Sequence, residues 1–256
     1  MTASIMAPKF TKWHRLAAVG LALCVWQLAA VLLASPLLLV TPVQVALRLG
    51  QLLGEGDFYA SVGFSLARII AGFLLGLAAG SLLAVLASRW PLAEVLLWPY
   101  ITAIKTTPVA SFIILCLIWL DSANLSVFIA FLMVVPIVYT NLLEGIRETD
   151  PKLLQMARVF GARPLRRVLY IYLPQLRPYL LTAASVSLGL SWKAGIAAEV
   201  IGIPEGSIGE RLYEAKVYLS SADLFAWTVV IIAISILFEK LFLLLLQRGY
   251  ARLQRR

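Results

Sequence analysis

The segment from Leu153 to Leu176, LLQMARVFGARPLRRVLYIYLPQL, is the most informative stretch of this chain. It contains four arginines, yet its apolar residues recur at helical spacing. Because an arginine within a bilayer is costly, the segment is too charged to be an ordinary membrane span. We therefore expect an amphipathic helical segment placed between hydrophobic ones.

The first half of the segment predicts a short helix with defined ends. Asp150 is a good N-cap, Pro151 suits the first helical position, and Gly161 suits the residue just after the helix, where positive φ is common. One face of this helix is polar and the other is apolar. The apolar face consists of Leu153, Met156, Ala157 and Phe160.

The second half predicts another short amphipathic helix, which starts in a new direction at Pro164. Pro174 and Pro178 punctuate the entry to the next hydrophobic stretch. The pattern leaves two roles open: a helical hairpin at the lipid headgroups whose arginines pair with anionic lipid, or a docking element for another protein. The apolar face of this second helix consists of Leu165, Val168, Leu169 and Tyr172.

The composition places the segment in an integral membrane protein. Of the 256 residues, 61% are hydrophobic and only 14% are charged, whereas soluble domains are about 45–50% apolar. A bilayer-spanning helix needs about 20 mostly apolar residues. The sequence therefore predicts an all-α fold with about six spans, over 16–34, 60–87, 96–120, 124–142, 176–198 and 223–246.

Three of these spans have features of their own. The first follows basic residues, as a signal peptide would, but its apolar run exceeds the roughly 7–15 residues of a signal peptide, so we expect a retained span. In the third, Pro99 and Pro108 predict a kinked or discontinuous entry, because proline breaks the helix hydrogen-bond ladder. The second span holds three glycines at a spacing that favours close helix packing, Gly72, Gly76 and Gly80.

The basic residues predict the orientation. The formal net charge is +9, and lysine and arginine accumulate on the cytoplasmic side of membrane proteins, so the charge does not imply nucleic-acid binding. With both termini in the cytoplasm, the outside segments hold only Arg48, Arg211 and Lys216. We predict a cytoplasmic N-terminal segment over 1–15, a transmembrane domain over 16–247 with a cytoplasmic loop over about 143–175, and a basic cytoplasmic tail over 248–256.

The opening segment also carries a family signature. Permease subunits of bacterial ABC importers have a cytoplasmic loop with Glu-Ala-Ala, three residues, glycine, nine residues, isoleucine, one residue, leucine and proline. Here QMA at 155–157 is followed at the same spacing by Gly161, Ile171, Leu173 and Pro174. The departures are a glutamine and a methionine in place of the family's glutamate and first alanine.

From about Thr41 to the C-terminus, the chain resembles the nitrate, sulfonate and taurine-type importer permeases. The stretches that carry this resemblance are SLARIIAGFLLGLAAG, PIVYTNLLEGIRETDPKLLQMARVFGA and AAEVIG…GSIG. The resemblance implies a type I ABC importer permease fold with cytoplasmic coupling helices, in a multi-pass protein of the bacterial inner membrane.

The same resemblance implies a set of partners. These are a second permease copy that completes a homodimer, two copies of a separate ABC ATPase that binds ATP and Mg²⁺, and an external substrate-binding protein. The expected solute is a small organic or inorganic anion such as a sulfonate, taurine or nitrate. The residues implied in ATPase coupling are Leu153, Gln155, Met156, Ala157, Phe160, Gly161, Ile171, Leu173 and Pro174.

The residue inventory argues against an enzyme. No G-x-x-x-x-G-K-[ST] phosphate loop occurs, so we expect no ATP site, no cofactor and no metal on this chain. An intramembrane protease needs a nucleophile–base pair or paired aspartates, but His14 lies outside the spans, and Asp121 and Asp223 stand singly at span ends. The stronger alternative is a secondary transporter or other polytopic membrane protein. A secondary transporter would normally show an internal repeat and paired ionisable residues at the midplane, and neither is evident.

Ionisable residues inside spans are costly, which makes them candidates for a solute path. Three cations, Arg68, Lys105 and Lys193, against the carboxylate Glu199 favour a small anion. The alternative is a structural role, for example a pair between Lys193 and Glu199. The translocation-path candidates are Arg68, Lys105, Ser187, Ser191, Trp192, Lys193 and Glu199.

Overall fold

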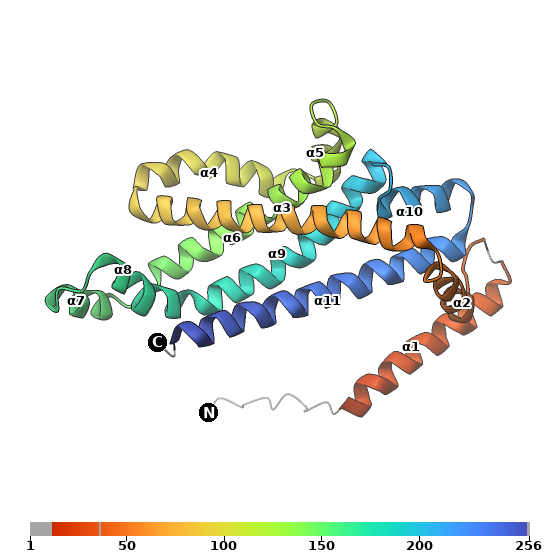
Figure 1. Ribbon diagram of the computed structural model, residues 1–256, viewed down its shortest axis with the longest axis horizontal. Helices are drawn as coiled ribbons and strands as arrows, with labels where there is room; N and C mark the ends of the chain where they lie inside the picture. Colours follow the sequence, from red (N-terminus) through yellow and green to blue (C-terminus); the bar gives the residue numbers. More distant parts are fainter. Residues whose placement is uncertain (1–11, 36, 255–256) are drawn as a thin grey trace, which may run out of the picture.

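The computed structural model describes residues 12–35 and 37–254, and within these ranges every regular element is helical. The long helices form an elongated bundle, with α7 and α8 at one end and α2 and α10 at the other (Figure 1). In chain order the elements are α1 (Lys12–Leu33), α2 (Pro42–Leu52), α3 (Gly56–Arg89), α4 (Pro91–Thr106), α5 (Val109–Cys116), α6 (Ser122–Arg147), α7 (Pro151–Val159), α8 (Pro164–Arg167), the π-helical turn η1 (Val168–Tyr172), α9 (Leu173–Gly202), α10 (Ile208–Val217) and α11 (Ser221–Gln254).

The prediction of an all-α membrane protein with about six spans is confirmed. Within the described residues, five helices are long and apolar enough to cross a membrane, and six spans result if the bent pair α4–α5 counts as one. That third span is not straight, because α4 and α5 meet at 104°. Pro108 has no N–H and holds Thr107 in an extended conformation, so the helix breaks there, whereas Pro99 stays inside α4.

The glycines of α3 allow this helix to pack closely against α6. A Cβ atom at Gly72 would lie 2.3 Å from the carbonyl oxygen of Val127, and one at Gly80 would lie 2.8 Å from that of Val135. In lipid, helices associate through such close van der Waals packing, because there is no water for apolar side chains to escape. The packing role predicted from the glycine spacing is confirmed.

The first and last helices extend beyond the predicted spans. Residues 1–11 of the predicted N-terminal segment lie outside the described residues, and α1 already begins at Lys12. α11 continues to Gln254, so the described part of the predicted tail is helical, while Arg255 and Arg256 lie outside the described residues. α1 leans away from the other helices (Figure 1), and only 6% of its apolar window is buried.

The short helix α2 attaches α1 to the bundle through one apolar face. A capping box between Thr41 and Gln44 starts α2, and its buried residues Val45 and Leu52 join a core cluster with Trp227 of α11. Residues at i and i+7 lie on the same face of a helix, so α2 can bury this face while the rest of its surface stays exposed.

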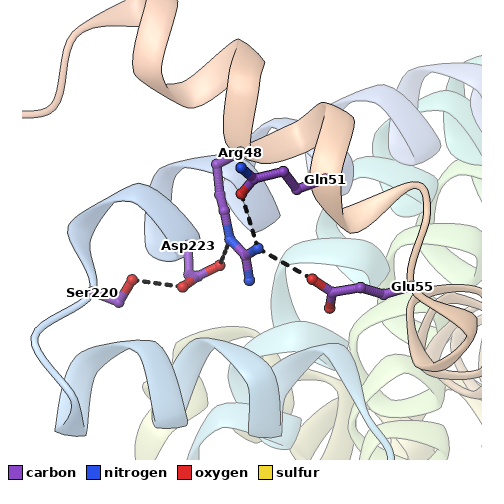
Figure 2. A network of polar contacts seen from close by, with 5 residues as sticks. All are labelled: Arg48, Gln51, Glu55, Ser220 and Asp223. Carbon is purple, nitrogen blue, oxygen red and sulfur yellow. Dashed lines mark hydrogen bonds and ion pairs between the residues drawn. The ribbon is translucent and has the colours of Figure 1, made fainter.

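A polar network holds α2 in the same place. Arg48 forms ion pairs with Asp223 of α11 and, at 3.1 Å, with Glu55 just before α3, and it also donates to Gln51 (Figure 2). Burial lowers the pKa of Arg48, but the hydrogen bond and charge of Asp223, together with Glu55, raise that pKa on balance. Ser220 donates to the second oxygen of Asp223 at 2.6 Å. One guanidinium group therefore joins α2, α11 and the start of α3.

Candidate functional site

The loop between α6 and α9 begins with α7, whose two ends form as the sequence predicts. The side chain of Asp150 accepts a hydrogen bond from the N–H of Lys152 at 2.8 Å. Gly161 has a φ of 64°, and the N–H of Ala162 donates to the carbonyl of Ala157 at 2.9 Å. This bond is the 6→1 contact of a Schellman motif, which requires a left-handed residue and so favours glycine.

The exposed face of α7 differs from the predicted one. Ala157, which the sequence interpretation placed on the outward apolar face, is only 5% exposed and packs toward its own chain, and its part in ATPase coupling stays a prediction. Val159, which the sequence interpretation left out, is 84% exposed, and Phe160 is 81% exposed, with Met156 half-exposed beside them. Helical spacing identifies an apolar stripe, but it does not say which part of the stripe the same chain covers.

The second half of the loop is not a separate helix, and that prediction is wrong. α8 runs through η1 into α9 without a break. The N–H of Leu173 donates to Val168, five residues back, which is π-helical and shifts the register. Pro174 follows directly after this π-helical turn, and Pro178 also stays inside the continuous helical run.

Several contacts anchor the loop to the bundle. Ile171 is buried, and the N–H of Asp150 donates to the side chain of Gln175 on α9 at 3.0 Å. Within the loop, Arg167 donates to the carbonyl of Ala162 at 2.8 Å. The outer surface stays apolar and cationic. Its exposed residues, here called the loop face, are Met156, Arg158, Val159, Phe160, Arg163, Leu165 and Arg166.

The predicted translocation-path residues on α9 are mostly buried inside the chain. Ser187, Ser191, Trp192 and Glu199 have almost no exposed surface within the chain, so their place in a path stays a prediction. They are buried because α9 packs against α3, α6, α10 and α11, and its small and polar residues mediate that packing. Both serine hydroxyls donate to carbonyls of their own helix, to Ala184 and Leu188.

The charged translocation-path candidates contact different partners. Lys193 is exposed, and within the described chain it forms no ion pair with Glu199, which accepts from Ser65 and Gly209 instead. Ser65 is a residue that sequence reasoning missed, although a serine inside an apolar span was a signal for it. Arg68 has a structural role: its guanidinium lies 3.7 Å from the ring centre of Phe64 and donates to a backbone carbonyl of α6.

Lys105 is the candidate that lines an open space. It is exposed in a cleft of about 270 Å³ between α4 and α6, next to Thr102 and Thr140. An ion pair between Glu94 and Arg147 closes one side of the cleft. The cleft therefore presents the Lys105 cation beside hydroxyl groups, and the carboxylate of Glu144 also lines it.

The chain is similar to known membrane transport proteins. Residues 72–256 match the family described as binding-protein-dependent transport system inner membrane component. A Bacillus subtilis (strain 168) protein named for aliphatic sulfonate transport, SsuC, is 28% identical over 229 residues, covering 88% of this chain and 82% of its own. The taurine transport system permease protein TauC of Escherichia coli (strain K12) is 27% identical over 220 residues, covering 84% of this chain and 80% of its own.

The fold has a counterpart among solved structures. The crystal structure of an amino acid ABC transporter with histidines matches with a TM-score of 0.57 and 19% identity, covering 77% of this chain and 94% of that one. At this identity the likeness supports the fold alone.

Proposed function

The chain belongs to the family of binding-protein-dependent transport system inner membrane components, and from this premise we propose how it works within its importer. It is a multi-pass permease subunit of an ABC importer in the bacterial inner membrane, and this family implies an ATPase and a substrate-binding protein as partners. This assignment replaces the alternative of a secondary transporter.

The proposed arrangement adds what the family assignment leaves open. Two copies of this chain form the translocation path, and two ATPase subunits bind the loop faces in the cytoplasm, where they hydrolyse ATP with Mg²⁺. Both termini lie on that side of the membrane, in agreement with the excess of lysine and arginine there. The binding protein delivers solute at the α2–α10 end.

The loop face is the observation that carries this proposal. Val159 and Phe160 are more than four-fifths exposed at one end of the bundle. Burying such a side chain contributes about 1.5–3 kcal/mol, so a groove on a protein partner would bind this face tightly. The flanking arginines add charge that can orient the partner.

The continuous helix behind the loop offers a route for motion. Pro164–Gly202 forms one run of 39 residues from the loop to the opposite end of the bundle. A displacement of the loop face would therefore be passed along a single rigid element, as in the helix shifts that accompany switching in other proteins.

Co-purification with the ATPase tests the docking role. Val159→Asp places a charge in the proposed interface and should weaken ATPase binding tenfold or more, which corresponds to about 1.4 kcal/mol. The matched control is Val217→Asp, since Val217 is also exposed but lies at the opposite end. The permease alone should hydrolyse no ATP. Retention of the ATPase by Val159→Asp at wild-type affinity would contradict the docking role.

We also propose that the solute is a small anion such as a sulfonate, taurine or nitrate. Lys105 in its cleft and the exposed Lys193 support this, as do the names of the two relatives. Lys105→Met and Lys193→Met should each lower taurine uptake by proteoliposomes that hold the whole importer, with assembly unchanged. Lys216→Met, at an exposed lysine of α10, is the control. Unaltered uptake in both variants would contradict an anion path past these lysines.

A further inference from the structure

The carboxyl group of Glu199 lies at a junction that the proposed function does not use. Glu199 sits in the last turns of α9 and has 0% exposed surface. Its Oε2 accepts from the hydroxyl of Ser65 on α3 at 2.6 Å and from the N–H of Gly209 on α10 at 3.3 Å. The hydroxyl of Ser65 in turn accepts from the N–H of Ile208 at 2.9 Å. Three helices thus meet at one buried carboxyl group.

The two N–H groups at this junction are the first two of α10. The first N–H groups of a helix have no partner within the helix, and they give its start a partial positive charge. α10 has its own N-cap, since Ser207 accepts from the N–H of Glu210 at 3.0 Å. The remaining two N–H groups are satisfied from other helices, by Ser65 and Glu199.

Two more residues surround the same carboxyl group. The charge of Arg68 on α3 acts on the carboxyl group, whereas the nearby hydroxyl of Ser126 on α6 and the Oε1 atom of Glu199 have no hydrogen-bond partner within the described residues. A buried carboxyl group is costly unless donors and opposite charge compensate for the lost water. The junction supplies two donors to Oε2, from α3 and α10, and the positive charge of Arg68.

The backbone approach at this junction is very close. A Cβ atom at Gly209 would lie 2.3 Å from the Cβ of Glu199 and 2.5 Å from the backbone nitrogen of Val200. Because no side chain fits there, the start of α10 rests directly on α9. The polar contact and the steric fit therefore fix the same turn.

We propose that Glu199 is a positioning residue, which fixes the first turn of α10 against α9 and α3 and so holds the end of the bundle to which solute is delivered. The link to solute delivery rests on the proposed function. Without the carboxyl group, the first turn of α10 opens more often, and delivery of solute becomes less efficient. The loop face lies at the other end of the bundle, so ATPase binding stays unchanged (Figure 1).

Hydrogen exchange in the assembled importer tests the anchor. Glu199→Ala should speed exchange of the peptide 204–217 by about tenfold, the loss expected for one buried hydrogen bond. Glu199→Gln retains a carbonyl acceptor and should speed exchange less. Glu205→Ala removes an exposed carboxylate from the turn before α10 and should leave exchange unchanged.

A double-mutant cycle identifies the shared junction. Ser65→Ala should also speed exchange of 204–217, and adding Glu199→Gln to it should have less than the sum of the two effects, because both act on one network. Additive effects would overturn the proposal, and so would unchanged exchange in both Ser65→Ala and Glu199→Gln. Ser65→Ala and Glu199→Gln still test the proposal if Glu199→Ala fails to fold.

The ratio of solute imported to ATP hydrolysed is a measurement that a purely structural residue would not change. In proteoliposomes, Glu199→Ala should lower the solute imported per ATP hydrolysed by several-fold while the ATPase stays bound, and Glu199→Gln should restore part of it. An unchanged ratio in Glu199→Ala would overturn the proposal. Absence of import by the wild-type importer would instead contradict the proposed function, and the exchange measurements would still test the anchor.

Discussion

The two ends of the bundle satisfy their helix termini in different ways. At the loop end, α7 is closed by its own neighbours in sequence, with Asp150 at its start and Gly161 just after its end. At the opposite end, the start of α10 is satisfied partly by Ser65 and Glu199, which are distant in sequence. The first end is closed mainly by local contacts, with one bond from the N–H of Asp150 to Gln175 on α9, whereas the second adds contacts between helices to its local cap.

This difference suits the roles proposed for the two ends. A locally closed helix keeps its shape when its surroundings change, so the loop face can bind a partner and move as one piece. An end that is joined across helices keeps its shape only while those helices stay together. α2 shows the same principle, because Arg48 joins it to Asp223 and Glu55 (Figure 2).

A matched pair of glycine variants gives the largest expected contrast between the ends. Gly209→Ala forces a Cβ atom to within 2.3 Å of Glu199, and such overpacking should cost about 3 kcal/mol or more. Gly161→Ala meets nothing within 4 Å, so it should cost only the roughly 1–2 kcal/mol of a left-handed alanine. Thermal unfolding of the purified permease in detergent compares the two. Equal losses would remove the contrast.

Overpacking at the loop end should have the next largest effect. Ala157 is buried against its own chain, so Ala157→Trp should push α7 off the bundle at a cost of about 1–3 kcal/mol. The spans should stay folded, but the displaced loop face should release the ATPase. Gln155→Glu, which restores the residue usual in this family, should retain it. Co-purification alongside a size-exclusion profile measures both, and an Ala157→Trp permease that keeps its ATPase would contradict this placement of α7.

Arg48→Gln tests how much the polar network stabilises the α2 end. Losing the partly buried ion pair should cost about 1.5 kcal/mol, with α1 and α2 becoming more accessible to protease while α7 stays unchanged. The pKa of Arg48 is raised, so above the pH at which its carboxylate partners are ionised its contribution is constant, and it is lost only as the pH rises through that raised value. The difference between wild type and variant should therefore be the same in neutral and mildly alkaline buffers. A difference that vanishes on mild alkalinisation would mean that another group carries the stabilisation.

The two N-caps give the smallest contrast. Asp150→Ala and Ser207→Ala each remove one side-chain cap, worth about 1 kcal/mol. Ser207 is buried and its helix is joined to α3 and α9, so Ser207→Ala should lower the melting temperature of the whole permease. Asp150→Ala should instead increase hydrogen exchange within 151–160 and leave the melting temperature nearly unchanged. The reverse pattern would show that the loop end, too, depends on distant contacts.

The amino-acid sequence predicts the features that depend on neighbouring residues. Apolar runs long enough to cross a bilayer identified the helices, and the Gly72 spacing identified the face of α3 that packs closely. Asp150 and Gly161 located the ends of α7, because caps act over three to five residues. The signature spacing through Pro174 pointed to the family that residues 72–256 match.

The tertiary structure alone decided which faces are covered. Ala157 and Val159 are two residues apart on one amphipathic helix, yet one is buried and the other is exposed, because burial depends on where the other helices lie. The sequence alone made Glu199 a path candidate, whereas the fold brings in Ser65 and Gly209, 134 and 10 residues away, as its hydrogen-bond donors. The spacing of apolar residues shows which side chains share one face of a helix. Which neighbour accepts each side chain is set by the packing of several helices at once.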